Sequence, residues 1–350
     1  MKLRFAFVYV LAISASLMVP GSMRGAATAL VSTNLAAMPE SVTSFGAVTD
    51  DGWLYVFGGH KGKRHEYSAD KVSGSFHRLR LSEGRAWESL PAAAPGQGLP
   101  LVTHGRHIYR IGGMAARNPA DAKQDLYSTN LVQRFDPRSG KWEDFASLPA
   151  PRSSHDAVVL GNKIYVAGGW QLTGTGTKPA WPASALVLDL SKPGVGWKEF
   201  AQPFQRRALA LAALGTRIFC IGGMDSDDEA TLAVDIFDTA TGEWKKGPEL
   251  PAGKHRGFSC SAVTQDGRVY ASAFKGELLR LATDEQSWEL VTRLQYQRMS
   301  HRLVTAGSSQ LIALGGEDGQ QKRPELELLT PASVKATQTA EVRRAEAQRQ

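Results

Sequence analysis

The 350-residue sequence contains only two cysteines, which are too few for a disulfide framework. Cys220 and Cys260 each fall in a segment that we expect to be a strand. We therefore predict two buried free thiols, with a disulfide between them as the alternative. The sequence also lacks a nucleophile elbow, a phosphate-binding glycine loop and a zinc signature, which removes the enzyme and metal-module classes that depend on those motifs.

A strong excess of one charge is missing as well. The chain carries a formal charge of +7, but residues 1–29 contain three cations, Lys2, Arg4 and Arg24, and no acid. Subtracting those three leaves +4 for the remainder. A charge of +4 does not indicate a nucleic-acid partner.

The N-terminus has the order of a secretory signal peptide. Lys2 and Arg4 precede an apolar run over residues 5–19, and small residues follow at 25–29. The run is short for a membrane span, so we predict cleavage after Ala29 and an exported protein, periplasmic or extracellular, without a span in the mature chain. An uncleaved anchor is the alternative. Residues 331–350 are polar, and we expect a disordered tail.

The sequence is rich in one repeated unit, a strand-forming apolar run that ends in two glycines. The units occur at Gly58, Gly112, Gly168, Gly222 and Gly315, with a degenerate copy at Ala273, so the steps are 54, 56, 54, 51 and 42 residues. A tryptophan follows five of the units, at positions 87, 142, 197, 244 and 288. A period near 50 residues with these two markers predicts one propeller blade per repeat.

Each repeat is interpreted as four strands. Strand a follows a Leu-Pro pair, strand b carries the two glycines, strand c precedes a turn such as residues 136–140, and strand d holds the tryptophan. We expect the glycines to allow close backbone packing near the axis and the tryptophans to wedge between blades. The pattern resembles the kelch repeat over residues 30–330, nearly the whole mature chain.

Six strand-b units but only five tryptophans predict a shared last blade. The segment 29–41 ends in Met38-Pro39, where other blades carry Leu-Pro, and otherwise fits strand d. We therefore predict an all-β, six-bladed kelch-type β-propeller over residues 30–330, in which an N-terminal strand completes the last blade and covers its open edge.

Strand direction then places the candidate site. The b–c and d–a loops must share one face of the propeller, so residues after the glycines face the same side as residues entering strand a. The arginines could bind an anionic ligand around the channel mouth, or could instead bond backbone between blades. The ligand-binding candidates on this face are His60, His65, Glu66, Arg152, His155, Trp170, Arg207, Arg256, Arg298 and His301.

Two further features concern the loops of this face. The spacing from glycine to tryptophan predicts long b–c loops in the first three blades, where binding sites commonly lie. Trp170 and Trp181 form either a stacking platform or a packing contact between loops.

The group of His60, His65, Glu66 and His77 matches no compact metal motif, and the acidic residues 225–229 lack an EF-hand pattern. We predict neither a metal nor a cofactor.

Three functions remain. The first is a non-catalytic, monomeric recognition module for a protein or glycan ligand at the channel mouth. The second follows from the similarity of an exported kelch propeller to sialic acid epimerases (mutarotases), with Glu66 or His65 as acid or base and Arg207 and Arg256 as anchors. The third, a copper enzyme similar to galactose oxidase, is disfavoured because both cysteines lie in strands and the additional domains are missing.

Overall fold

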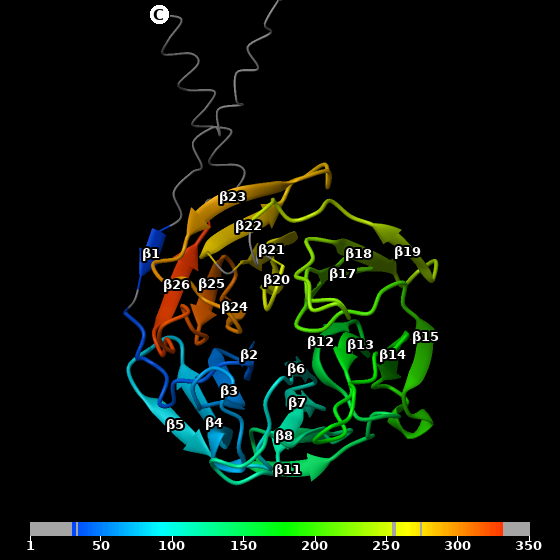
Figure 1. Cartoon of the computed structure of the whole chain (residues 1–350). Helices are drawn as coiled ribbons and strands as arrows, with labels where there is room; N and C mark the ends of the chain where they lie inside the picture. Colours follow the sequence, from blue (N-terminus) through cyan, green and yellow to red (C-terminus); the bar gives the residue numbers. More distant parts are fainter. Residues whose placement is uncertain (1–29, 33, 254–256, 274, 332–350) are drawn as a thin grey trace, which may run out of the picture.

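The computed structural model describes residues 30–32, 34–253, 257–273 and 275–331. These residues form six four-stranded antiparallel sheets arranged as blades around a central axis (Figure 1). Two 3-10 turns, η1 (Ala69–Lys71) and η2 (Pro193–Val195), lie in connections. No helix in the described part of the chain is long and apolar enough to cross a membrane. The predicted six-bladed propeller is confirmed.

The blades follow one another in sequence, each running outward from its inner strand. Blade one contains β2 (Gly46–Asp50), β3 (Trp53–His60), β4 (Val72–Arg80) and β5 (Trp87–Leu90). Blade two contains β6 (Leu101–His104), β7 (His107–Ile111), β10 (Val132–Asp136) and β11 (Lys141–Asp144), with an extra hairpin of β8 (Met114–Ala116) and β9 (Leu126–Ser128). Blade three contains β12 (Ser153–Leu160), β13 (Lys163–Trp170), β14 (Ser184–Asp189) and β15 (Lys198–Ala201).

The second half repeats the arrangement. Blade four contains β16 (Ala210–Leu214), β17 (Arg217–Ile221), β18 (Val234–Asp238) and β19 (Glu243–Lys246). Blade five contains β20 (Ser261–Gln265), β21 (Arg268–Ser272), β22 (Glu277–Leu281) and β23 (Trp288–Arg293). Blade six contains β24 (Arg302–Ala306), β25 (Gln310–Leu314), β26 (Leu326–Thr330) and, as its outer strand, β1 (Leu30–Ser32) from the N-terminal side.

The ring closes as the sequence predicted. Strand β1 pairs antiparallel with β26, in a register that places Val31 opposite Leu329. At the axis, β2 of blade one contacts β24 of blade six as well as β6 of blade two. Blade six contains strands from both ends of the described chain, and this pairing closes the ring of blades.

The core lies between the blades, where the apolar faces of neighbouring sheets meet. One cluster packs blade-four residues such as Phe219 and Ile236 against blade-five residues such as Leu279 and Trp288. Another joins Phe45 of blade one to Leu314 of blade six. Such burial of apolar area is the main stabilising contribution in a protein of this kind.

The tryptophans link blades through their indole N–H groups as well as their rings. Trp142 donates to the Pro91 carbonyl at 2.9 Å and Trp197 to the Ala146 carbonyl at 2.7 Å. Trp87, Trp244 and Trp288 make the corresponding bonds to the blade before their own. The predicted wedge therefore has a polar component that repeats around the ring.

The paired glycines are required by backbone geometry. Gly58 and Gly59 have φ values of 67° and 108°, which side chains rarely adopt. A Cβ at Gly58 would meet the Gly96 carbonyl oxygen at 2.4 Å. The Gly59 N–H donates to that same carbonyl at 2.8 Å, so the glycines let one blade approach the next closely enough for a backbone hydrogen bond.

Candidate functional site at the channel mouth

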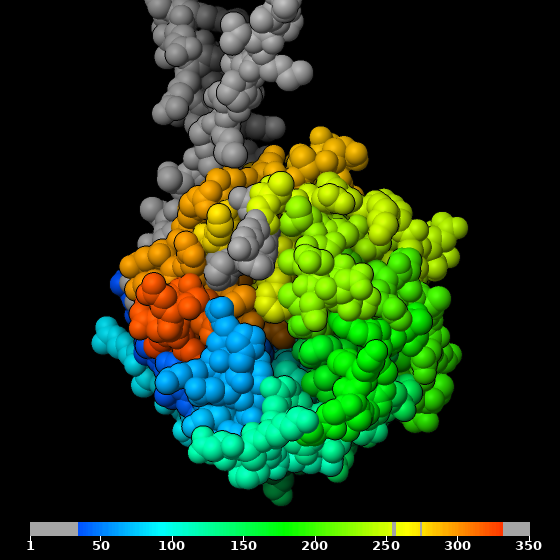
Figure 2. Space-filling view, in the orientation of Figure 1, coloured from blue at the N-terminus to red at the C-terminus, as the bar shows by residue number. Residues whose placement is uncertain are grey.

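The b–c and d–a loops lie on one face, as predicted from strand direction. Residues that follow the glycines bridge residues that precede the inner strands: His60 pairs with Thr43, Trp170 with Ser153, and Met224 with Arg207. In Figure 2 the loops of this face surround a hollow at the centre of the ring. We call this the mouth face.

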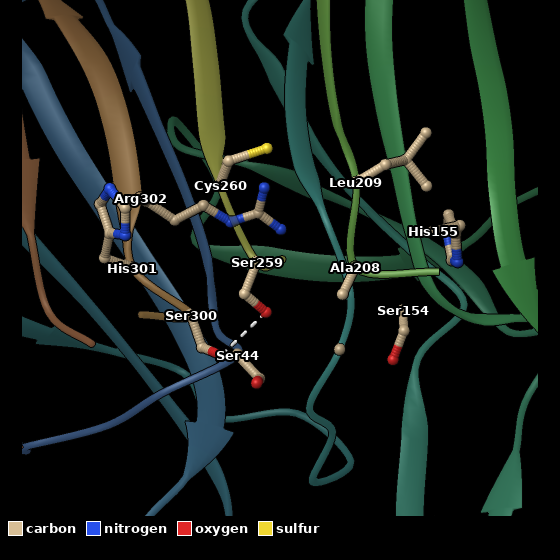
Figure 3. A pocket seen from close by; sticks show the side chains of 11 residues that line it. Ser44, Ser154, His155, Ala208, Leu209, Ser259, Cys260, Ser300, His301 and Arg302 are labelled. Carbon is tan, nitrogen blue, oxygen red and sulfur yellow. Dashed lines mark hydrogen bonds between the residues drawn. The ribbon is translucent and has the colours of Figure 1, made fainter. Parts of the chain in front are cut away.

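One residue at or just before the start of each inner strand contributes to a ring around the axis, which we call the throat. All six have left-handed φ values between 50° and 62°. At five steps the backbone N–H donates to the carbonyl of the preceding member at 2.6–2.9 Å, and at the sixth the hydroxyl of Ser300 donates to that of Ser259 at 3.1 Å (Figure 3). The throat residues are Ser44, Gly98, Ser154, Ala208, Ser259 and Ser300.

Arg302 of blade six extends into the channel behind the throat (Figure 3). It donates to the Phe45 carbonyl at 2.9 Å, the Leu99 carbonyl at 3.0 Å and Oδ1 of Asp156 at 3.0 Å. Oδ2 of Asp156 accepts from the Leu211 N–H at 2.9 Å, so these two side chains connect blades one to four with blade six. Arg302 lines both a pocket of about 60 Å³ at the throat and a cavity of about 310 Å³ inside the channel, and so lies between the two.

Sequence reasoning overlooked Arg302 and Asp156. Residues 152–155 and 298–301 each begin with an arginine and end in a serine and a histidine. Asp156 follows the first segment and Arg302 follows the second. Opposite charges at the same register in opposite blades are the signal that would have identified this pair.

The predicted arginines at the entry to strand a are buried. Arg152 donates to the carbonyls of Gly168 and Ser184, and Arg298 to those of Gly315 and Glu325. Both have the structural environment that the sequence left open as the alternative to ligand binding. Arg256 lies outside the described residues.

The predicted histidines of the same segments are buried too. Burial lowers the pKa of His155 to about 3, helped by the nearby cations Arg152 and Arg302. Burial also lowers the pKa of His301 to about 3, and its Nε2 lies 2.5 Å from the hydroxyl of Ser272. Both imidazoles are therefore neutral near pH 7 and lie among packed side chains beside the throat.

Arg207 and Trp170 lie together on the mouth face. The Arg207 guanidinium stacks 4.2 Å over the Trp170 ring and 5.8 Å from that of Phe258. Its Nη2 lies 2.8 Å from the sulfur of Met224 and 3.0 Å from Oδ1 of Asp228. The adjacent Arg206 is instead buried, whereas the Arg207 side chain is 16% exposed.

The blade-one candidates also include one buried residue and two exposed residues. His60 is buried, its Nε2 lies 2.8 Å from the Glu66 carbonyl oxygen, and burial lowers its pKa. Its ring packs 4.7 Å from that of Tyr67. His65 and Glu66 have exposed side chains in the following loop. Across the described residues, no three metal-binding side chains are grouped to hold an ion.

The loops of blades one to three join into a continuous structure, the loop wall, formed by residues 61–71, 114–128 and 171–182. The Ala69 N–H donates to the Asn118 carbonyl at 2.9 Å, and the Ser128 N–H to the Leu172 carbonyl at 2.9 Å. The Thr175 N–H donates to Asp125 at 2.8 Å. Part of the spacing that predicted a long loop in blade one lies instead in strand β4.

Trp181 belongs to this wall, and its partner Trp170 ends strand β13 beside it. The two rings lie 5.8 Å apart with an interplanar angle of 55°, and both are half-buried. The rings contact each other, and Trp170 also contacts Arg207. The arrangement holds a guanidinium on an aromatic face at the edge of the mouth.

Comparison with known proteins gives consistent results. A model of the kelch motif matches residues 151–174 and 205–251. Beta-scruin of Limulus polyphemus is 28% identical over 208 residues, covering 58% of this chain and 21% of scruin. Kelch repeat and BTB domain-containing protein 12 of Danio rerio is 25% identical over 270 residues, covering 71% of this chain and 42% of that protein.

The chain thus spans less than half the length of these relatives. A solved structure, that of YjhT, matches with a TM-score of 0.67 at 16% identity, covering 85% of this chain and 95% of the other, which shows a shared fold. In its motif, its relatives and its architecture, this chain resembles the kelch-repeat β-propellers.

Proposed function

We propose that this protein is an exported recognition module that binds a protein ligand on the mouth face. The observation that carries the proposal is the closed throat. Its pocket measures only about 60 Å³, and the larger channel cavity of about 310 Å³ lies behind it and Arg302. A narrow throat beside a hydrogen-bonded loop wall suits a ligand that covers the surface better than one that enters the channel.

The chemistry of the mouth also supports a protein ligand. Trp170, Met224 and Phe258 are half-buried and contact Arg207. Aromatic residues, methionine and arginine are the residue types enriched at protein interfaces, and they contribute most of the binding energy there. Kelch-type propellers are commonly protein-binding modules, which favours the same conclusion.

Arg207 is the residue on which we expect binding to depend most. Stacking on Trp170 and the ion pair with Asp228 hold its guanidinium in place before a ligand arrives. Asp228 is largely exposed, with 75% of its side chain accessible, so a ligand carboxylate can replace it at low cost. A preoriented arginine loses little entropy on binding.

Export rests on the composition of residues 1–29, which lie outside the described residues. If the segment is a signal peptide, N-terminal sequencing of the mature protein should begin at Leu30. An N-terminus at Met1 in a membrane fraction would instead support an uncleaved anchor.

The binding proposal is tested by comparing two faces of the same propeller. Full-length protein, the variant Arg207→Ala with Trp170→Ala, and the control Lys163→Ala on the opposite face are immobilised and exposed to extracytoplasmic extract. A ligand identified by mass spectrometry is then produced and titrated. We expect its affinity to fall at least about tenfold in the mouth variant and to be unchanged in the control.

Two outcomes would contradict this proposal. Equal binding of the identified ligand by the mouth variant would place the site elsewhere. A rise in thermal midpoint with N-acetylneuraminate or a neutral sugar, lost in Arg207→Ala, would replace the protein ligand with a glycan or favour the sugar-enzyme alternative.

A further inference from the structure

Three buried arginines occupy the same place in blades three, four and six. Arg152, Arg206 and Arg298 each stand two residues before the throat. Each donates to the carbonyl of the first glycine of its own blade and to a carbonyl at the start of strand c. The three arginines therefore occupy equivalent positions in repeated blades. A difference in the surroundings of one of them can indicate a separate role.

Two of these arginines are neutralised by a buried carboxylate. Asp235 lies 2.6 Å from Arg206, and Glu327 lies 2.9 Å from Arg298. Each acid stands in strand c, two residues after the carbonyl that accepts from the arginine (Ala233 or Glu325). All four charged side chains are at most 4% exposed.

Blade three lacks this acid. The accepting carbonyl belongs to Ser184, and two residues later stands Leu186. Arg152 is 4% exposed and forms no ion pair with any described residue. A buried cation that forms no ion pair is costly. Burial lowers the pKa of Arg152 to about 10, although the Glu199 carboxylate acts in the opposite direction.

Arg152, which forms no ion pair with Glu199 or any other described residue, adjoins a pocket of about 200 Å³. Arg152 and Leu186 line it together with Trp181, Glu199, Pro149 and Pro151. Arg110 of blade two provides a contrast: it is equally buried without a described carboxylate partner, but its guanidinium lies 4.4 Å over the Phe57 ring. Among the three equivalent arginines, only Arg152 lacks the strand-c acid and also lines one of the described pockets.

We propose that this blade-three pocket binds a carboxylate, which takes the place that Asp235 and Glu327 occupy in the other blades. Guanidinium groups bind carboxylates through paired, charge-assisted hydrogen bonds. The indole of Trp181 and the prolines suit an apolar group attached to the acid. Such an acid is either a small free molecule or the carboxylate of a peptide. This site is separate from Arg207 and does not depend on the mouth being the protein-binding surface.

The test uses 3-phenylpropionate, which joins a carboxylate to an apolar ring, and its neutral amide. Both are titrated into the full-length protein by calorimetry. We expect the acid to bind and the amide to bind at least about tenfold more weakly, because the amide lacks the charge that Arg152 requires. Failure of the acid to bind folded protein would overturn the proposal.

Leu186→Glu is the informative variant, because it gives blade three the acid that blade six already has. We expect it to abolish binding of 3-phenylpropionate in a protein that still unfolds cooperatively, with Leu186→Met as its control of similar volume. The Leu186→Met protein should bind like wild type. Binding that survives Leu186→Glu would overturn the proposal.

If Leu186→Glu does not fold, the proposed carboxylate site can still be tested on the wild-type protein by NMR. The assigned Nε–Hε resonance of Arg152 should shift on addition of the acid and not of the amide, and an unmoved resonance contradicts the site. A short peptide with a C-terminal phenylalanine distinguishes the sources. Tighter binding than 3-phenylpropionate identifies a peptide carboxylate, and equal binding a small free acid.

Discussion

Arg302 of blade six and Asp156 of blade three are ion-paired at 3.0 Å across the channel, although 146 residues separate them in the chain. In a ring of six, these blades stand opposite each other. The Arg302 guanidinium also bonds carbonyls of blades one and two, and Asp156 accepts from the backbone of blade four. This pair therefore fixes the position of inner strands that are not neighbours.

Removing one partner of this pair should destabilise the whole ring. Asp156→Asn or Arg302→Met leaves the other charge in the channel with its partner gone, and we expect each to lower the free energy of unfolding by roughly 3 kcal/mol. Urea denaturation measures this loss. The control is Arg134→Met, whose ion pair with Glu143 is on the exposed outer rim and should contribute at most about 1 kcal/mol. An Asp156→Asn effect no larger than the control would contradict the assignment.

The buried histidines predict that stability falls in acid. His155 and His301 have folded-state pKa values of about 3, below the ordinary value of 6.5. Between these values the unfolded chain binds more protons than the folded one, so stability decreases as the pH falls from about 6.5 towards 3. Each histidine should cost about 2 kcal/mol at pH 5 relative to pH 7.5.

His155→Leu provides the control for this prediction, because leucine occupies the same place after the throat residue in blades two and four, at Leu99 and Leu209. The variant should lose about half of the acid sensitivity measured by urea denaturation at the two pH values. An unchanged pH dependence would show that His155 is not the group that titrates.

The fold was predictable because its signals repeat. Each blade needs glycines where its backbone meets the next blade, as at Gly58, and an indole that reaches the preceding blade, as at Trp197. One such signal is weak, but five or six in one period define the architecture. The missing sixth tryptophan indicated that the N-terminal segment supplies a strand, and the pairing of β1 with β26 confirms it.

The site was less predictable because side-chain direction does not follow from position alone. Arg206 and Arg207 are adjacent in sequence, yet one is buried against Asp235 and the other stacks on Trp170. Successive side chains of an extended segment point to opposite sides, and Arg152 and Arg298 stand at the position that points inward. Only comparison between blades separates these roles, since the structural arginines share one register and Arg207 stands one residue later.

Both cysteines should be unreactive in the folded protein. Each is buried and free, as predicted, and the Cys260 thiol donates to the Ile221 carbonyl at 3.3 Å. Burial raises the pKa of Cys260 to about 12 and that of Cys220 well above its ordinary value, so neither forms the reactive thiolate near pH 7. Ellman's reagent should label two thiols in denaturant and none without it. Rapid labelling of either thiol under native conditions would contradict this packing.

The N-terminal closure makes the last prediction. Besides the β1–β26 pairing, the Met38 N–H donates to the Pro324 carbonyl at 2.8 Å, and the Ala36 carbonyl accepts from Trp87 at 3.1 Å. Met38 is 5% exposed in a cluster shared by blades one and six. A chain that begins at residue 41 would lose these contacts and expose the edge of β26 for pairing with another chain.

Compared with a chain that begins at residue 30, we expect this truncation to lower the thermal midpoint by at least about 5 °C, which corresponds to a few kcal/mol in a domain of this size. Met38→Ala should account for about 2–3 kcal/mol of the loss, since it removes a buried side chain between the blades. Val195→Ala, at a side chain that is 64% exposed, is the control and should leave the midpoint unchanged. Equal midpoints for the two chain lengths would mean that blade six holds without its fourth strand, and that the ring is closed by the inner strands and the Arg302–Asp156 pair alone.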